Sequence, residues 1–265
     1  GGPNPRVRLY ASTAVHRTAT DTVTVVQRLE REGFEAVKVR VGRQRLGDDL
    51  EVIEAVCSST SMKVMVDCNQ GWRMPWDVAE PWDVERVWPF ARRLAELGVF
   101  WIEEPLERGD YEGLTELRRR LNGSGLLVAG GEMTREPYEF RELLQRGCLD
   151  VFQPDVVCTH GVSGLASLAR RVLDEGHLFT PHTWGNGIGV LANLHLVAGA
   201  VGEASGWVEW PFDPPEWTLE RRDYPLAEPL RHVGGEFVLS DRPGLGIVLD
   251  EDVLARTLST KATFQ

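Results

Sequence analysis

Short apolar runs alternate along the chain with longer stretches in which apolar residues recur at helical spacing. Eight of the runs are rich in β-branched and aromatic residues, which is typical of buried strands. Their starts lie 25 to 36 residues apart, which is the length of one strand, one helix and two loops. The runs are residues 7–12, 36–42, 64–69, 100–105, 126–132, 151–156, 177–182 and 207–211.

The stretches between the runs predict helices. Leu50, Ile53 and Val56 follow one another at helical spacing. Gly98 and Gly147 come after helical stretches and shortly before the next run, where helices commonly end. Eight strand–helix units predict an α/β fold, a (β/α)8-type TIM barrel in a modified (β/α)7β form, since no clear helix follows the eighth run. A doubly wound open sheet is the alternative, although no GxGxxG follows the first run.

The predicted barrel covers most of the 265 residues. We expect it to span residues 7–250. Residues 1–6 are rich in Gly and Pro and are interpreted as the remnant of a linker, and residues 251–265 as a C-terminal tail.

Composition limits the partners of the chain. The formal net charge is −11 and the sequence pI is about 5.1, which argues against nucleic-acid binding. No apolar run approaches the ~20 residues that a membrane-spanning helix needs. No signal peptide opens the sequence, and the four cysteines lack CxxC spacing. We therefore expect a cytoplasmic protein with reduced thiols, without a membrane or nucleic-acid partner.

Polar side chains gather where the runs end. In a parallel barrel all strands end at the same rim, and this rim carries the chemistry. Seven successive runs bring an ionisable group there, which is difficult to explain by simple surface exposure. The residues are Lys38, Arg40, Asp67, Asn69, Glu103, Glu104, Glu132, Asp155, His182 and Glu209.

Three of these carboxylates end adjacent runs and predict a metal site. Asp67, Glu103 and Glu132 would converge at the rim, and three ionised carboxylates need a cation to share that space. A set of oxygen ligands without His or Cys favours Mg²⁺, with Mn²⁺ possible. Three protein ligands leave coordination positions for water and substrate, which is typical of a catalytic site.

Two further pairs stand out at the rim. Lys38 and Arg40 are two residues apart on one run, so both face the same way. They either neutralise the carboxylates or act on a substrate. Asp155 and His182 end neighbouring runs, and a buried carboxylate beside an imidazole fixes its tautomer and raises its basicity. His182 is therefore the candidate general base.

The run ends, taken in order, resemble the enolase superfamily and its mandelate racemase subgroup, which includes acid-sugar dehydratases. The matching segments are KVR, VDCN, WIEEP, GGE, QPD, PHTWG and VEWP. The resemblance implies that Asp67, Glu103 and Glu132 bind Mg²⁺ and that Asp155 and His182 form a dyad. It further implies that Lys38 and Glu209 contact a substrate carboxylate as it becomes an enediolate, with Ser12 and Asn69 as further substrate contacts.

Two departures from the subgroup shape the expected activity. The second Lys of its KxK motif is Arg40 here, and arginine stays protonated in nearly any protein environment. From the resemblance we further expect that this chain lacks the N-terminal capping domain of the family. The resemblance then favours a one-base Mg²⁺-dependent dehydration of a sugar acid to a 2-keto-3-deoxy acid.

Two alternatives to dehydration stay open. One is a hydroxy-acid racemase or epimerase, which Arg40 disfavours. The other is a non-catalytic or truncated metal-binding barrel. The expected partner is a small sugar acid, and the resemblance further implies a homo-oligomer.

Overall fold

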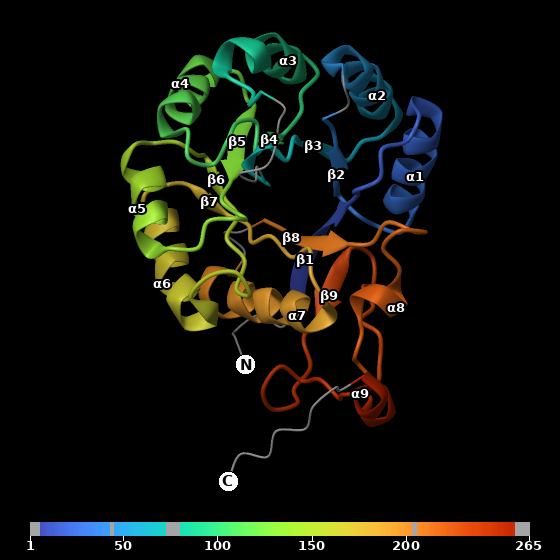
Figure 1. Ribbon diagram of the computed structural model, residues 1–265. Helices are drawn as coiled ribbons and strands as arrows, with labels where there is room; N and C mark the ends of the chain where they lie inside the picture. The colour runs from blue at the N-terminus through green and yellow to red at the C-terminus, as the bar shows by residue number, and fades with distance from the viewer. Residues whose placement is uncertain (1–5, 43–44, 73–79, 203–205, 258–265) are drawn as a thin grey trace.

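The fold is described by a computed structural model for residues 6–42, 45–72, 80–202 and 206–257. Eight parallel strands follow one another around a common axis, and the helices lie outside them (Figure 1). Each of the eight predicted runs contains a strand, so the predicted α/β barrel is confirmed. The strands are β1 (Arg6–Ser12), β2 (Ala36–Arg40), β3 (Lys63–Asp67), β4 (Trp101–Glu103), β5 (Leu127–Gly130), β6 (Val151–Phe152), β7 (Leu178–Phe179) and β8 (Val208–Pro211).

The helices return the chain from the end of one strand to the start of the next. Side chains cap several of them: Thr18, Asp83 and Asn186 each accept a hydrogen bond from a backbone N–H of the first turn. The helices are α1 (Ala19–Arg31), α2 (Leu46–Ser59), α3 (Val84–Glu96), α4 (Tyr111–Leu121), α5 (Pro137–Gln145), α6 (Gly161–Asp174) and α7 (Gly187–Leu196), with short helical turns at Gln70–Trp72 and Val197–Val201.

The sheet runs in the order β7-β6-β5-β4-β3-β2-β1-β8. In the described part of the chain no backbone ladder joins β7 to β8, and a side chain joins these two ends instead. Thr183, just after β7, donates from its backbone N–H to Glu209 Oε2 at 2.9 Å and from its hydroxyl to the Glu209 carbonyl at 2.6 Å. The barrel is thus closed at the rim where the predicted site lies.

The inside of the barrel has two layers of different character. Successive side chains of a strand alternate between its two faces, so residues two apart share the interior. The lower layer is apolar and fully buried, whereas the next inward positions on β2, β3 and β4 are Lys38, Asp67 and Glu103. The apolar layer consists of Tyr10, Ala36, Met65, Trp101, Ala129 and Val151.

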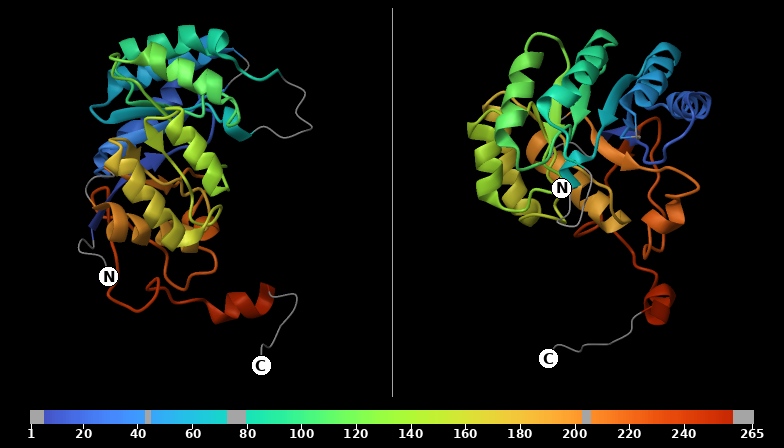
Figure 2. Two further views of the ribbon diagram at one scale, coloured as in Figure 1. Left: turned by 90° about the vertical axis from the view of Figure 1, so that its left-hand side faces the viewer. Right: turned by 45° about the horizontal axis from the view of Figure 1, so that its top comes forward.

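The last fifty residues contain short elements: α8 (Leu219–Arg222), β9 (Glu236–Val238) and α9 (Glu251–Thr257). A tight turn bridges Val233 and Glu236, and β9 then pairs antiparallel with the first half of β1, with Arg6 opposite Val238. Helix α9 buries none of its residues and stands away from the barrel (Figure 2). None of the helices in the described ranges is long and apolar enough to cross a membrane.

Candidate active site

Six buried carboxyl groups lie at the carboxyl ends of β3 to β8. Strand register places Asp67 directly beside Glu103, and Glu132 follows three residues after Ala129, the neighbour of Glu103 on β5. All six are at most 4% exposed, so they are withdrawn from water together. The six are Asp67, Glu103, Glu104, Glu132, Asp155 and Glu209.

The Lys38 ammonium lies among these carboxylates. Its Nζ is 2.5 Å from Glu103 Oε1, 2.8 Å from Glu209 Oε1 and 3.9 Å from Asp67 Oδ2. Burial disfavours the charged ammonium, but the charges of Glu103 and Glu209 outweigh it and raise the pKa of Lys38 well above its ordinary value. Lys38 is therefore a fixed positive charge, placed where an anionic substrate group can meet it.

The carboxyl groups of β3 and β4 are poorly compensated. Burial raises the pKa of Glu103 to about 8, and Asp67 and Glu132 add to the effect against the opposing charge of Lys38. Burial also raises the pKa of Asp67, with Lys38 opposing and Glu132 reinforcing the shift. This cluster has fewer positive charges than its carboxylates need.

Two donors hold the second oxygen of Glu103. Gln153 Nε2 donates to Glu103 Oε2 at 2.7 Å, and Trp101 Nε1 donates to the same oxygen at 3.1 Å. Oε1 is thereby directed toward Lys38 and the neighbouring carboxylates. Sequence reasoning did not assign these two roles, although Gln153 stands beside the predicted dyad in QPD and its position at the end of β6 was a usable signal.

The predicted dyad of Asp155 and His182 is present. His182 Nδ1 lies 2.9 Å from Asp155 Oδ2, and its Nε2 lies 3.8 Å from Glu132 and 3.9 Å from Glu209. Burial would lower the pKa of His182, but the charges of Glu132 and Glu209 and the bond with Asp155 outweigh it and raise the pKa to about 10. Nε2 thus points into the cluster, the direction that a proton acceptor for a bound substrate needs. With a pKa of about 10 the ring is an imidazolium at neutral pH, so it must lose its Nε2 proton before it can act as a base.

Glu209 lies between Lys38 and His182. Burial would raise its pKa, but these two cationic neighbours outweigh burial and lower it to about 2. Ser12 is buried at the end of β1 near Glu209 and helps to lower the pKa of Glu209, and its hydroxyl is without a hydrogen-bond partner in the described structure. The substrate contact expected of Ser12 stays a prediction.

Arg40 is at the mouth of the barrel. Its side chain is 32% exposed, and its guanidinium lies 3.7 Å from Asp67 Oδ2 and 5.9 Å from the centre of the Trp184 ring. Trp184 in turn stacks on Trp217 from the loop after β8, with ring centres 5.7 Å apart. Arg40 thus faces the same space as the carboxylates, with one side covered by indole.

The ends of β3 and β4 carry strained backbone. Asn69 and Glu104 have φ of +47° and +44°, a left-handed conformation that is costly for side chains other than Gly. Asn69 Oδ1 and Glu104 Oε2 are both buried without a hydrogen-bond partner. Buried oxygens of this kind are rare and commonly mark a functional site.

The donor set suits Mg²⁺ or Mn²⁺. Asp67, Glu103 and Glu132 supply carboxylate oxygens, and the unpartnered oxygens of Asn69 and Glu104 lie beside them in sequence. As the side chains lie, no three His, Cys, Asp or Glu residues of the described ranges are arranged to hold a metal ion. The Lys38 ammonium bonds Glu103, and the Trp72 indole N–H donates to Glu132 Oε1, so both carboxylates already have partners. The metal site of the sequence analysis stays a prediction.

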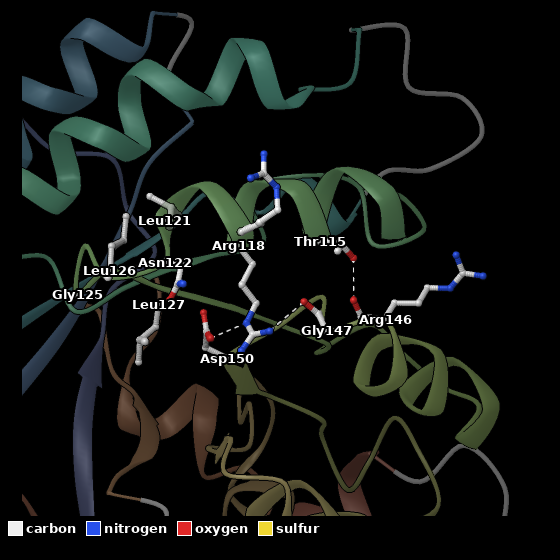
Figure 3. A pocket seen from close by; sticks show the side chains of 12 residues that line it. Thr115, Arg118, Leu121, Asn122, Gly125, Leu126, Leu127, Arg146, Gly147 and Asp150 are labelled. Atoms are coloured by element: carbon white, nitrogen blue, oxygen red, sulfur yellow. Dashed lines mark hydrogen bonds and ion pairs between the residues drawn. The ribbon is translucent and has the colours of Figure 1, made fainter.

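The largest cavity described, about 740 Å³, lies away from this cluster, at the start of β5 and β6 (Figure 3). Three arginines line it, and each is paired with an acid: Arg118 with Asp150, Arg119 with Glu116 and Arg146 with Glu142. Barrel chemistry occurs at the other end of the strands. Size alone therefore does not locate the site.

The fold and the ring of polar groups define a class of parallel α/β barrel with acidic groups at the carboxyl ends of its strands. Residues 21–253 match the family model described as "Enolase C-terminal domain-like". The chain belongs to this family, and the resemblance to the enolase superfamily that the sequence indicated is confirmed.

Named relatives are similar over nearly the whole chain. D-galactarolactone cycloisomerase of Agrobacterium fabrum is 30% identical over 94% of this chain and 64% of its own length. Arabinonate dehydratase of Saccharolobus solfataricus is 27% identical over 96% of this chain and, again, 64% of its own length. The chain thus spans somewhat less than two thirds of these relatives.

Solved structures show the same likeness. A mandelate racemase/muconate lactonizing protein of Paracoccus denitrificans, complexed with magnesium, is 28% identical and superposes with a TM-score of 0.82. The match covers 97% of this chain and 66% of that one. The 3,6-anhydro-D-galactonate cycloisomerase of Zobellia galactanivorans is 26% identical, with a TM-score of 0.81, over 98% of this chain and 68% of that one.

Proposed function

We propose that this chain is the catalytic barrel of a Mg²⁺-dependent lyase that dehydrates a sugar acid to a 2-keto-3-deoxy acid. The observation that carries the proposal is the His182 imidazole, which is oriented by Asp155 and directed at the carboxylate cluster that also holds Lys38. The family match and the dehydratases among the relatives support the same chemistry.

Asp67, Glu103 and Glu132 are the proposed holders of the divalent cation. When bound, the cation would supply positive charge that stabilises the anion formed on the substrate carboxylate. Glu103 is suited to this role because Gln153 and Trp101 fix one of its oxygens and leave the other directed inward. A magnesium-containing relative supports the choice of metal.

Lys38, Glu209 and Ser12 are the proposed contacts at the carboxylate end of the substrate. The Lys38 ammonium is buried and charged, so it can receive developing negative charge without solvent competition. Glu209 Oε1 lies 2.8 Å from the same ammonium, and it helps to hold Lys38 toward the substrate carboxylate. Asn69 is a further proposed contact, through its unpartnered side-chain oxygen.

His182 moves the proton in the proposed reaction. Its Nε2 takes the proton from the carbon beside the carboxylate, and Asp155 stabilises the resulting imidazolium through Nδ1. The same imidazolium then returns the proton to the β-hydroxyl, which leaves as water. The enol that remains converts to the 2-keto-3-deoxy acid, so the only net loss is one molecule of water.

Arg40 separates this reaction from racemisation, which needs a base on each face of the reacting carbon. Arginine does not serve as a base at neutral pH, and the guanidinium of Arg40 lies between Asp67 and the face of Trp184. We therefore expect a substrate that is incubated with the enzyme to disappear into keto acid without accumulation of its C2 epimer. NMR of the unreacted sugar acid checks this, and epimer accumulation would favour the racemase alternative.

The test is a screen of aldonates and aldarates with purified protein and Mg²⁺, in which 2-keto acid formation is measured. We expect His182→Asn to lower kcat by about 10²–10⁴-fold. His195→Gln is the matched control, because His195 is a half-buried histidine of α7 that contacts only the Leu245 carbonyl among the bonds described. Keto acid formation that survives in His182→Asn or in EDTA would contradict the proposal. Mg²⁺ binding without turnover of any acid would favour a non-catalytic barrel.

A further inference from the structure

Helix α7 has one polar residue, Asn193, among buried residues that are otherwise Gly, Val and Leu. Asn193 stands in the segment IGVLANLHLV and is fully buried, with an exposed fraction of 0%. Burial of an amide costs free energy unless its N–H and C=O groups are hydrogen-bonded. The contacts of Asn193 therefore show what this residue does for the fold or for the site.

All of the polar atoms of Asn193 have partners, and these partners include one member of the dyad. Nδ2 donates to Asp155 Oδ1 at 2.9 Å and to the Gly189 carbonyl at 3.2 Å. Oδ1 accepts from the backbone N–H of Val156 at 3.2 Å. These contacts are compatible with only one orientation of the amide, because two acceptors face Nδ2 and a donor faces Oδ1.

The two oxygens of Asp155 have separate tasks. Oδ1 accepts from Asn193 and from the backbone N–H of Val157 at 3.0 Å. Oδ2 accepts from His182 Nδ1 at 2.9 Å. The carboxylate plane, and with it the direction of Oδ2, is therefore set by the donors on Oδ1.

We propose that Asn193 is a positioning residue for the dyad: it fixes the Asp155 carboxylate and thereby the imidazole of His182. Without the Asn193 donor, a single backbone N–H would hold Oδ1, and the carboxylate could turn about its side-chain bond. The His182 ring would then lose its fixed direction toward the reacting carbon. The effect on turnover rests on the proposed function, whereas the effect on the His182 ring does not.

Two substitutions separate this role from a purely structural one. Asn193→Asp keeps the size of the side chain and an acceptor for Val156, but it replaces the donor that faces Asp155 with an oxygen. Asn193→Leu keeps similar volume and removes all three bonds. His195→Gln is the matched control on the same helix, since His195 does not contact the dyad in the described structure.

The first readout is the Nδ1 proton of His182, observed by NMR in [¹⁵N]His-labelled protein without metal or substrate. We expect a slowly exchanging downfield signal in the wild type and in His195→Gln. In Asn193→Asp and Asn193→Leu we expect the signal of this proton to disappear through faster exchange with water, because Asp155 then holds it less firmly. The loss of such outer hydrogen-bond partners commonly lowers activity by about 10- to 100-fold. A merely structural role of Asn193 would leave the signal unchanged.

The second readout is turnover of the sugar acid found in the screen. We expect both Asn193 variants to lower kcat by about 10- to 100-fold with KM nearly unchanged. Mg²⁺ affinity, measured by calorimetry, should stay at the wild-type value because Asn193 contacts none of the proposed ligands. An unchanged His182 signal together with an unchanged kcat would overturn the proposal.

The outcomes also separate this inference from the proposed function. If the wild type turns over no sugar acid, the proposed function fails, and the NMR signal still decides the role of Asn193. If the wild type turns over a sugar acid and the variants keep both this turnover and the His182 signal, the inference fails alone. Should Asn193→Leu not fold, Asn193→Ser replaces the amide with a smaller polar group, and the same two readouts apply.

Discussion

Single residues at the rim carry charges that the protein interior tolerates only in combination. Lys38 is 2% exposed, and its single positive charge is shared by Glu103 and Glu209 at hydrogen-bond distance. Removal of one partner from a buried ion pair leaves the other charge without compensation, and this commonly costs more than the pair contributes. The rim is therefore a place where function and stability depend on the same atoms.

The first prediction concerns Lys38→Met. We expect this change to lower the free energy of unfolding in EDTA by about 3–5 kcal/mol, because Glu103 and Glu209 lose their shared cation. Lys63→Met is the matched control: Lys63 is exposed at the start of β3 and only approaches the Phe100 ring, so its loss should cost about 0.5 kcal/mol or less. Urea unfolding measures the stability of both variants. An equal loss of stability in the two would contradict the role of Lys38 as a buried counter-charge.

At the residue scale the sequence predicted which side chains reach the rim, but not all of their partners. Lys38, Asp67 and Glu103 point into the barrel because side chains alternate between the two faces of a strand, and all three stand near the ends of their strands. The Trp72 contact with Glu132 and the Gln153 contact with Glu103 depend on loops and on strands distant in sequence. No local pattern encodes such pairings, so they required the folded structure.

A buried ion pair joins the loops that follow two neighbouring strands, β1 and β8. Asp213, in the loop after β8, accepts from the backbone N–H groups of Ala14 and Val15 at 2.8 Å each and pairs with Arg17. This contact ties the loop after β1 to the loop after β8. We call these contacts of Asp213 the Asp213 clamp. Trp217 belongs to the same loop and supports Trp184 beside Arg40, so the Asp213 clamp also shapes the mouth of the barrel.

The second prediction concerns Asp213→Asn. The amide would turn a donor toward groups that are themselves donors, and Arg17 would lose its buried counter-charge. We expect the free energy of unfolding to fall by about 3 kcal/mol. Glu216→Gln, an exposed change in the same loop, should have little effect. Thermal and urea unfolding of both variants measure the difference, and an Asp213→Asn protein as stable as the control would contradict the clamp.

At the element scale the sequence predicted the eight strands better than their lengths or their partners. Strands β6 and β7 contain two residues each, because the chain leaves the ladder early to place Gln153, Asp155 and His182 at the rim. The turn before β9 is local, whereas the pairing of β9 with β1 joins segments more than 200 residues apart. Such long-range pairing leaves no short-range signal in the sequence.

The interior of the barrel is apolar in its lower layer and charged at the carboxyl ends of the strands. A fully buried apolar layer lies beneath the carboxylate cluster and keeps water from it. Most of the expected linker and of the expected C-terminal tail, residues 1–5 and 258–265, lies outside the described ranges. The oligomeric state stays a prediction.

The third prediction concerns the pH dependence of stability. His232 packs against the rings of Phe34 and Trp210, and burial lowers its pKa below the ordinary value, with Glu32 opposing and Arg222 adding to the shift. The unfolded chain therefore binds a proton at this histidine more readily than the folded protein. The stabilising contribution is complete above the ordinary pKa near 6.5 and is lost as the pH falls through the folded pKa.

We expect His232→Gln to reduce the loss of stability between about pH 7.5 and pH 5.5, because glutamine does not titrate. Urea unfolding of wild type and variant at both pH values gives the difference. His16→Gln is the control, since His16 lies in the loop after β1, away from these rings. A pH dependence as steep in His232→Gln as in the wild type would contradict this assignment.

The most direct test of the whole account is exchange of the substrate α-proton in heavy water, followed by ¹H NMR with the wild type and His182→Asn. With Mg²⁺, the account predicts that the wild type exchanges the α-proton of at least one sugar acid. It predicts that exchange stops in His182→Asn and in EDTA. Exchange that persists in the variant, or no exchange of any sugar acid while Mg²⁺ binds, would contradict it.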